Sequence, residues 1–360
     1  MTYYHHRYGS NKKKKSIFAR IFLWLIVILV VVTAAISWFM YEIVLQPNVW
    51  TPSGEPVSVF IPTDADFDQV KSILYEKGLI VHRANFEWWA HKKNYPELVK
   101  PGHYVIQNNL SNNALIDMLR SGKQVPVRVV FNNQRDIYQL AGRVSEQIEA
   151  DSASIVVFLT NEATLQKFNL TKETISCLFI PNTYEFYWNT SATGFTERME
   201  EEYLTFWNDA RKMQARNMNM TIPQVITLAS IVEKETNKND EKALIAGVYV
   251  NRLDAGWLLQ ADPTLVYALN DKNIHRVLNV HKDIESPYNT YKNPGLPPGP
   301  ICIPSIASID AVLNHSHEEN LFFCAKDDLS GYHVFTKSYA QHNRNAYKYR
   351  KALDEMKVFK

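Results

Sequence analysis

The sequence predicts a mixed α+β fold that follows a single N-terminal membrane-spanning helix. Residues 21–41 carry no charged side chain and consist mostly of Ile, Leu, Val, Phe and Trp. Further along the chain, a short segment at 57–61 alternates as a strand does, and longer segments repeat their apolar residues at helical spacing. No internal repeat is visible, and 360 residues allow two or three domains. We therefore expect an α+β protein of more than one domain.

The N-terminal segment has the features of a membrane anchor. Residues 1–20 hold six basic side chains and no acidic one, and Glu42 follows the apolar run. An apolar run of this length crosses a bilayer as a helix, and the positive-inside rule places the basic tail, residues 1–16, in the cytoplasm. The alternative is a cleaved signal peptide, but the run is longer than a usual h-region and lacks a convincing cleavage site. We expect an uncleaved, single-pass helix at residues 17–41, with the rest of the chain outside the cytoplasmic membrane.

Composition excludes several classes of function. The chain has 39 Lys and Arg residues, and the six within residues 1–20 leave 33 against 37 acidic groups in the rest. The body therefore has no nucleic-acid-binding signature. The histidines between residues 315 and 342 have no clear metal spacing, so we expect no metal and no other cofactor. Three cysteines show neither metal-ligand spacing nor a disulfide framework: Cys177, Cys302 and Cys324.

The first part of the body predicts a small domain, residues 56–128, behind a Pro/Ser/Gly linker at 42–55. We expect a strand at 57–61, helices at 66–76 and 85–94, a strand at 102–106 and a Ser-capped helix at 111–119 followed by Gly122. The last three features resemble half of a LysM-type peptidoglycan-binding module, although any small βα unit can have this pattern. The segment thus either binds carbohydrate or serves as a spacer that holds the next domain off the membrane.

The main domain is expected at residues 129–360, opened by a strand at 127–131. Residues 179–186 are extended and aromatic, and 321–325 and 333–336 predict a β-hairpin. Apolar spacing and end signals predict helices at 137–148, 154–160, 196–217, 242–253, 262–269 and 338–356. For the helix at 262–269, we expect Asp262 to act as the N-cap rather than as a catalyst.

A further, central helix begins near Thr221 and ends in two carboxylates, Glu233 and Glu235. Thr221 and Gln224 predict a capping box at its start. At about 100° per residue, Glu233 falls within the apolar arc of this helix. A carboxylate on a buried helix face is costly unless it is paired or protonated, and such an environment produces a general acid at neutral pH. The alternative is a structural ion pair with an Arg. The polar face of the helix is expected to hold Thr227, Ser230 and Lys234.

An ordered series of motifs resembles the YceG-like family of endolytic murein transglycosylases. The series runs ASIVEKET (229–236), IAGVYVNRL (245–253), LQADPT (259–264), YNTY (288–291) and GLPPGPI (295–301). The resemblance covers about residues 129–360, and the anchor and LysM-like segment also match the family's layout. Trp257 and Ala261 depart from the commonest family form, which could alter the shape of a subsite.

The resemblance implies a lysozyme-like catalytic domain that cleaves the β-1,4 bond between N-acetylmuramic acid and N-acetylglucosamine without water. Glu233 matches the first Glu of the family's EKE motif, and on that resemblance it protonates the leaving oxygen. It then removes the proton of the muramic acid 6-hydroxyl, which attacks C1 and forms a 1,6-anhydro ring. The sequence alone does not choose between Glu233 and Glu235. Because it places no second catalytic carboxylate, the tethered hydroxyl is expected to outcompete water.

The substrate contacts expected from these motifs come from Glu235, Arg252, Gln260, Asn289 and Tyr291. Arg252 pairs either with a carboxylate in the site or with one at the surface. Gln260 suits a hydrogen bond to an N-acetyl or hydroxyl group. Asn289 and Tyr291 stand beside a Pro-rich loop, either as a wall for sugars or as a packed turn.

Three functions are compatible with these features. The first is an endolytic transglycosylase that cuts newly made glycan strands and so ends their elongation. The second is a water-using muramidase on the same scaffold, and the third is a non-catalytic protein that binds the wall. The implied partners are peptidoglycan glycan strands and the cytoplasmic membrane, with proteins of a wall-synthesis complex implied by the family alone.

Overall fold

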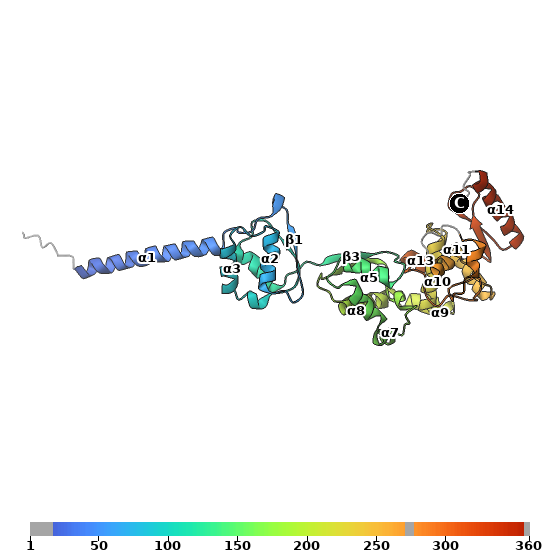
Figure 1. Ribbon diagram of the computed structural model, residues 1–360, viewed down its shortest axis with the longest axis horizontal. Coiled ribbons are helices and arrows are strands. Elements are labelled where there is room, and N and C mark those ends of the chain that lie inside the picture. The colour runs from blue at the N-terminus through green and yellow to red at the C-terminus, as the bar shows by residue number, and fades with distance from the viewer. Residues whose placement is uncertain (1–16, 271–276, 356–360) are drawn as a thin grey trace, which may run out of the picture. The chain divides into compact units, whose positions relative to one another are not determined.

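The computed structural model describes residues 17–270 and 277–355 and divides the chain into two compact units, 1–125 and 126–360 (Figure 1). The boundary thus lies three residues before the expected one. Each unit has its own hydrophobic core, and the second unit has two clusters of buried side chains. The mixture of helices with three two-stranded sheets confirms the expected α+β class.

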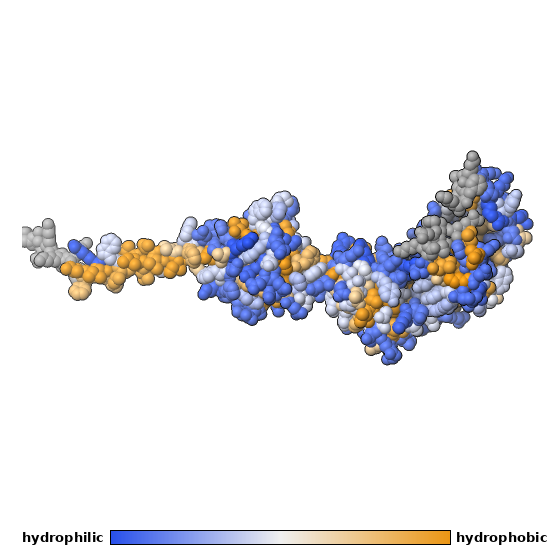
Figure 2. Space-filling view, in the orientation of Figure 1, coloured by the Kyte–Doolittle hydropathy of each residue, from blue (hydrophilic) through white to orange (hydrophobic). Residues whose placement is uncertain are grey.

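Helix α1 (Ile17–Val44) contains the apolar run and continues three residues beyond its expected end. Its length and hydropathy suit a membrane span, and none of its most apolar window is buried within the protein. Figure 2 shows most of this helix as hydrophobic surface, with hydrophilic atoms near its N-terminal end. The choice between an uncleaved anchor and a signal peptide stays a prediction.

The rest of the first unit is built around a two-stranded antiparallel sheet. The strands β1 (Val57–Ile61) and β2 (Gly102–Ile106) pair from Val57↔Ile106 to Ile61↔Gly102. The sequence between and after them forms α2 (Phe67–Glu76), α3 (Arg83–Lys92), a 3₁₀ turn at Pro96–Leu98 and α4 (Asn112–Ser121), and another 3₁₀ turn, Pro52–Gly54, precedes β1. Ser111 caps α4 and Gly122 ends it in the left-handed conformation, as expected from the sequence.

The segment expected to be a linker is instead part of this unit. Asn48 is buried, and its Nδ2 donates hydrogen bonds to His82 O (3.1 Å) and Asn112 Oδ1 (2.7 Å). Val49 is also buried and forms a β-bridge with Ile80. These partners lie more than 30 residues away along the chain, so local composition did not reveal them.

The second unit begins with another antiparallel pair, β3 (Val127–Phe131) with β4 (Asn182–Phe186). Around it lie α5 (Ile137–Ser145), α6 (Ser152–Thr160), α7 (Glu162–Phe168), a 3₁₀ turn at Ile175–Leu178 and α8 (Ala192–Phe206). The expected helix at 196–217 is wrong as one element, because Trp207 leaves the helical conformation. Asn208 then accepts a hydrogen bond from Arg211 N and starts α9 (Asp209–Asn217).

The remainder of the unit packs around the central helix α10 (Ile222–Glu235). It comprises α11 (Lys242–Asp254), α12 (Asp262–Leu269), a 3₁₀ turn at Asn279–Asp283, α13 (Ile306–Leu313), β5 (Phe322–Ala325), β6 (His333–Thr336) and α14 (Tyr339–Glu355). The expected hairpin is confirmed as the β5–β6 pair. Helix α13 was not expected, and it proves important because its N-terminus reaches the end of α10.

Helix α10 is buried almost all round. Thr221 and Gln224 form the expected capping box. The expected polar face is wrong for Thr227 and Ser230, which are both buried. Each hydroxyl donates to a carbonyl within the helix, and Ser230 also accepts a hydrogen bond from Ile301 N at 2.9 Å. Because α9, α11, α12 and α13 all contact α10, its C-terminal residues occupy a fixed position.

Candidate active site

The C-terminal end of α10 places Glu233 and Glu235 in different surroundings. The two side chains are separated by about 200° around the helix. Glu233 lies at the junction with α11 and α13, whereas Glu235 borders a cleft. The sequence left the choice between them open, and their environments differ in charge, hydrogen bonding and access.

Glu233 is held in an almost buried ion pair. Lys242 Nζ donates to Glu233 Oε2 at 3.1 Å, and the two side chains are 5% and 11% exposed. The same oxygen accepts hydrogen bonds from the hydroxyls of Ser305 (2.5 Å) and Ser308, while Asn133 Nδ2 donates to Oε1 at 3.1 Å. The carboxylate thereby joins α10 to α11, to the N-terminus of α13 and to the loop after β3.

These contacts keep Glu233 ionised. Burial by itself raises the pKa of this carboxyl, but the hydrogen bonds from Ser305 and Ser308 and the adjacent ammonium group of Lys242 outweigh it and lower the pKa overall. Glu233 is also absent from the residues that line the cleft. Its surroundings match the structural ion pair that the sequence offered as the alternative, with a Lys in place of an Arg.

Glu235 has the opposite character. It accepts a hydrogen bond from the hydroxyl of Tyr249, a buried residue of α11. Burial, together with the negative charge of Asp262, raises the pKa of Glu235 to about 7, although the hydrogen bond from Tyr249 and the positive charge of Arg252 act to lower it. A carboxyl group with this pKa holds its proton at neutral pH about half of the time. Glu235 can thus both give and take a proton.

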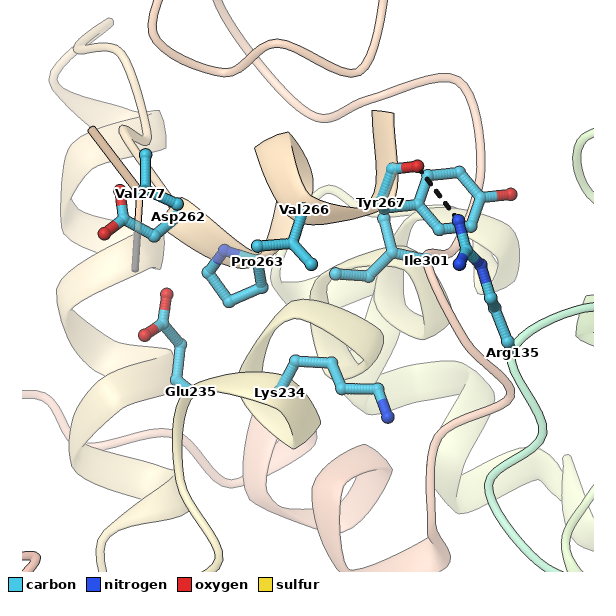
Figure 3. A pocket seen from close by; sticks show the side chains of 9 residues that line it. All are labelled: Arg135, Lys234, Glu235, Asp262, Pro263, Val266, Tyr267, Val277 and Ile301. Atoms are coloured by element: carbon cyan, nitrogen blue, oxygen red, sulfur yellow. Dashed lines mark hydrogen bonds between the residues drawn. The ribbon is translucent and has the colours of Figure 1, made fainter. Parts of the chain in front are cut away.

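Glu235 lines a cleft of about 500 Å³ in the second unit (Figure 3). In this view, the carboxyl groups of Glu235 and Asp262 lie at one end and Arg135 lies at the other. The cleft is lined by Arg135, Lys234, Glu235, Asp262, Pro263, Val266, Tyr267, Val277 and Ile301. An apolar floor with few polar groups is typical of a ligand-binding site.

Asp262 belongs to this cleft, and the expectation that it serves as a helix cap is wrong. It is the first residue of α12, whose N-cap position is taken by Ala261 without a side-chain hydrogen bond. Asp262 Oδ1 instead accepts a hydrogen bond from the hydroxyl of Tyr291 at 2.6 Å. The motif DPT thus directs a carboxylate toward Glu235. Tyr291 is connected to the site by its hydrogen bond to Asp262.

Arg252 supports the site from behind. Its Nη1 donates to Leu259 O at 2.6 Å and its Nε donates to Leu321 O at 2.8 Å. Among the described residues it forms neither of the expected ion pairs, although its charge acts on Glu235. Arg252 is 9% exposed and fixes the segment that leads to Asp262.

Asn289 and Gln260 are not among the residues that line the cleft. Asn289 is fully buried, and its Nδ2 donates to the carbonyls of Lys282 (2.9 Å) and Ile284 (2.8 Å). This is the packed turn that the sequence offered as the alternative to a sugar contact. Gln260 is exposed and has a positive φ of 50°, while its backbone N–H bonds to Thr290 O at 3.0 Å.

Sequence reasoning missed two cations of the cleft. Lys234 is expected from the sequence only as part of a polar helix face, and it is the residue of that face that lines the cleft. Arg135, in the loop between β3 and α5, carried no recognisable signal, because its position depends on contacts made across about 130 residues of chain. The described residues contain no group of three or more His, Cys, Asp or Glu side chains that could hold a metal ion.

Residues 59–348 match the profile of the YceG-like family. An endolytic murein transglycosylase of Bacillus subtilis (strain 168) is 28% identical over 334 residues, which cover 88% of this chain and 91% of the relative. A protein of the same description from Streptococcus pneumoniae (strain R6) is 29% identical over 344 residues. That alignment covers 86% of this chain but only 61% of the longer streptococcal relative.

A solved structure is also similar. The crystal structure of a protein described as yceG-like, from Listeria monocytogenes, aligns with a TM-score of 0.54 and 25% sequence identity. The alignment covers 81% of this chain and 98% of the Listeria chain. The fold therefore matches along nearly the whole length of that protein.

Proposed function

The chain belongs to the YceG-like family, and from this premise we propose that it cleaves peptidoglycan glycan strands internally, as an endolytic murein transglycosylase. Its relatives in Bacillus and Streptococcus carry that name. The bond cut in this proposal is the β-1,4 linkage between N-acetylmuramic acid and N-acetylglucosamine. The observation that carries it is a protonatable carboxyl group, Glu235, at one end of a cleft in the second unit.

Glu235, rather than Glu233, is the proposed acid. A general acid must hold a proton near neutral pH and must reach the substrate. Glu235 meets both conditions, because its pKa is raised to about 7 and it borders the cleft. Glu233 meets neither, since the hydrogen bonds from Ser305 and Ser308 and the ion pair with Lys242 lower its pKa, and it is not among the residues that line the cleft. The hydrogen bond from Tyr249 orients one oxygen of Glu235 and leaves the other for the glycosidic oxygen.

In the proposed reaction, Glu235 protonates the leaving oxygen of the N-acetylglucosamine unit. The resulting carboxylate accepts the proton of the muramic acid 6-hydroxyl, which attacks C1 and closes a 1,6-anhydro ring. One group serves both steps because the first step leaves it in the state that the second step needs. Asp262 supplies negative charge close to the site where positive charge develops on the sugar ring.

The position of Asp262 also favours the second candidate, a water-using muramidase. Glycosidases that use water generally need two carboxyl groups across the scissile bond. The expectation of a transglycosylase rested partly on the absence of a second carboxylate, and Asp262 removes that part of the argument. The remaining support is the name of the relatives and the tethering of the 6-hydroxyl to the reacting ring.

Cleavage of purified glycan strands in ¹⁸O-labelled water tests the proposal. We expect unlabelled products whose new muramic acid ends are one water lighter than hydrolysis would give, as measured by mass spectrometry. Fragments of intermediate length early in the reaction indicate endolytic cutting. Label at the new muramic acid ends would replace this function with the muramidase. Binding without cleavage, unchanged in Glu235→Gln, would support the non-catalytic wall-binding protein instead.

The proposed location is the outer face of the cytoplasmic membrane. The basic N-terminal tail would lie in the cytoplasm and α1 would cross the bilayer once. Residues 56–126 would then lie outside and contribute carbohydrate binding, as their LysM-like pattern suggests. Proteins of a wall-synthesis complex remain proposed partners through the family alone.

A further inference from the structure

The cleft has two ends of opposite charge. Glu235 and Asp262 form one end, while the guanidinium of Arg135 and the ammonium of Lys234 extend toward the other (Figure 3). The apolar side chains of Val266 and Ile301 line the cleft between these ends. The two acids account for the proposed chemistry, but the two cations have no part in it.

Arg135 is held in place while part of its guanidinium stays available. Its Nη2 donates to Tyr267 O at 3.1 Å, and the guanidinium lies over the Tyr267 ring at 5.3 Å from the centroid. The loop that carries it is tied down by the hydrogen bond from Ile303 N to Gln134 O, at 2.8 Å. A guanidinium has five N–H donors, so donors remain for a ligand in the cleft.

Lys234 is exposed at the end of α10, whose position is fixed by packing. Within the described residues, neither Lys234 nor Arg135 has a carboxylate close enough for an ion pair. By contrast, Lys242, the first residue of α11, is paired with Glu233. Two cations at one end of a cleft, without an ion-pair partner in the part of the chain that the structure describes, form a site for a carboxylate, which guanidinium groups bind with matching geometry.

We infer that Arg135 and Lys234 bind a carboxylate of the peptide stem carried by the muramic acid that is cleaved. This inference rests on the proposed function. The scissile bond starts at C1 of that sugar, and the lactyl side arm that carries the stem is attached at C3 of the same ring. A muramic acid whose C1 lies beside Glu235 must therefore direct its side arm along or out of the same cleft. The cations at the far end favour strands that still carry their stems.

The test compares two substrates with the full-length protein. One is glycan strands with intact stems, and the other is the same strands with all carboxyl groups converted to amides by carbodiimide and ammonia. On intact strands, Arg135→Gln and Lys234→Gln should each lower kcat/KM about tenfold, the value of one hydrogen bond to a charged group. On amidated strands, the wild type should fall to the level of the variants. Equal losses on both substrates would overturn the inference.

A third substrate separates the stem from the sugar. Amidase treatment removes the peptide and leaves a free lactyl carboxylate on each muramic acid. If the stem is the ligand, the variants should cleave these strands as the wild type does. If the variants cleave these strands about tenfold less efficiently than the wild type does, the cations bind the lactyl carboxylate, and the stem assignment is overturned.

Two controls complete the design. Arg216→Gln and Lys348→Gln remove exposed cations outside the cleft and should leave all three substrates unaffected. Binding of the three strand types to Glu235→Gln protein, with and without Arg135→Gln, gives the same comparison without cleavage. A wild type that binds intact strands more tightly than amidated ones but cuts neither would refute the proposed function and retain this inference. A wild type that cuts both substrates equally, with variants that cut as well as the wild type, would retain the proposed function and refute this inference.

Discussion

Lys242 Nζ lies 3.1 Å from Glu233 Oε2, and this ion pair connects the N-terminus of α11 to the C-terminal end of α10. The hydroxyls of Ser305 and Ser308, at the N-terminus of α13, donate hydrogen bonds to the same carboxylate oxygen. The junction fixes the end of α10 from one side, and Glu235, two residues further on, faces the cleft from the other. The first carboxylate of the EKE motif thus holds the end of the helix in place, and the second one is the proposed acid.

Glu233→Gln should destabilise the protein by about 3–5 kcal/mol, because it leaves the buried ammonium of Lys242 without a counter-charge. Chemical denaturation measures this loss. The double variant Glu233→Gln/Lys242→Met is the matched control and should recover much of the stability, since it also removes the charge. A Glu233→Gln protein of normal stability with no activity would restore Glu233 as the candidate acid.

Glu235→Gln should lower strand cleavage by about 10²–10⁴-fold while keeping the fold, because it retains the shape and removes the transferable proton. The measurement is kcat on purified strands, accompanied by the melting temperature. Near-normal cleavage by this variant would refute the assignment. Tyr249→Phe should give a smaller loss, since it removes only the hydrogen bond that orients the carboxyl group.

The rate should fall as the pH rises through about 7, because burial raises the pKa of Glu235 to that value and the acid must be protonated. Asp262→Asn removes a negative charge that favours the protonated form, so the alkaline limb should move to lower pH. The pH dependence of kcat/KM for both proteins checks this. An alkaline limb that does not move would show that the charge of Asp262 has no influence on the acid.

The same raised pKa makes a statement about stability. The raised pKa of Glu235 contributes fully to stability at pH values below 4.5, its ordinary pKa. This contribution is lost as the pH rises through about 7, because the unfolded chain releases the proton at a lower pH than the folded protein does. Glu235→Gln should flatten the decline in unfolding free energy between these values. A wild-type stability curve with no decline there would contradict the assigned pKa.

A reporter fused after Lys360 should act outside the cytoplasm and remain with the membrane fraction. The reason is the basic tail before α1, which retains the N-terminus inside, and the length of α1, which suits a bilayer span. A processed, soluble protein would show that α1 is a signal peptide instead. The same reporter fused to a variant in which the lysines at 12–15 are replaced by neutral residues tests whether these charges set the orientation.

A fragment that begins near Val127 should retain some cleavage but attach less strongly to isolated sacculi. The second unit contains the whole cleft, whereas residues 56–126 are expected to bind glycan. Co-sedimentation with sacculi, with and without the first unit, measures the difference. Equal attachment of both proteins would favour the spacer interpretation.

The sequence was sufficient where the deciding signals are local. The capping box of Thr221 and Gln224, the cap of α4 at Ser111 and the β5–β6 hairpin follow from residues a few positions apart, and the structure contains all three. The apolar helix α1 is equally local, because only its own length and composition define it. The family could also be inferred, since its motifs have a fixed order along the chain.

The roles of the acidic residues could not be derived in this way. At helical spacing, Glu233 and Glu235 both lie beside apolar residues, and only the positions of Lys242, Ser305 and Tyr249 distinguish them. Asp262 has the pattern of a helix cap, yet one residue of difference in the helix start turns it toward the cleft.

Length, composition and local spacing thus determined the long apolar helix α1, most helices and strands, and the pair of carboxylates at the end of α10. The tertiary structure alone decided which carboxylate is paired and which is protonatable, and it brought Arg135 to the same cleft. The physical reason is that the pKa of a carboxyl group depends on burial and on charges within a few ångströms. Here those charges come from α11 and α12, and hydroxyl groups at the N-terminus of α13 add hydrogen bonds; the chain reaches all three helices only after intervening turns and loops.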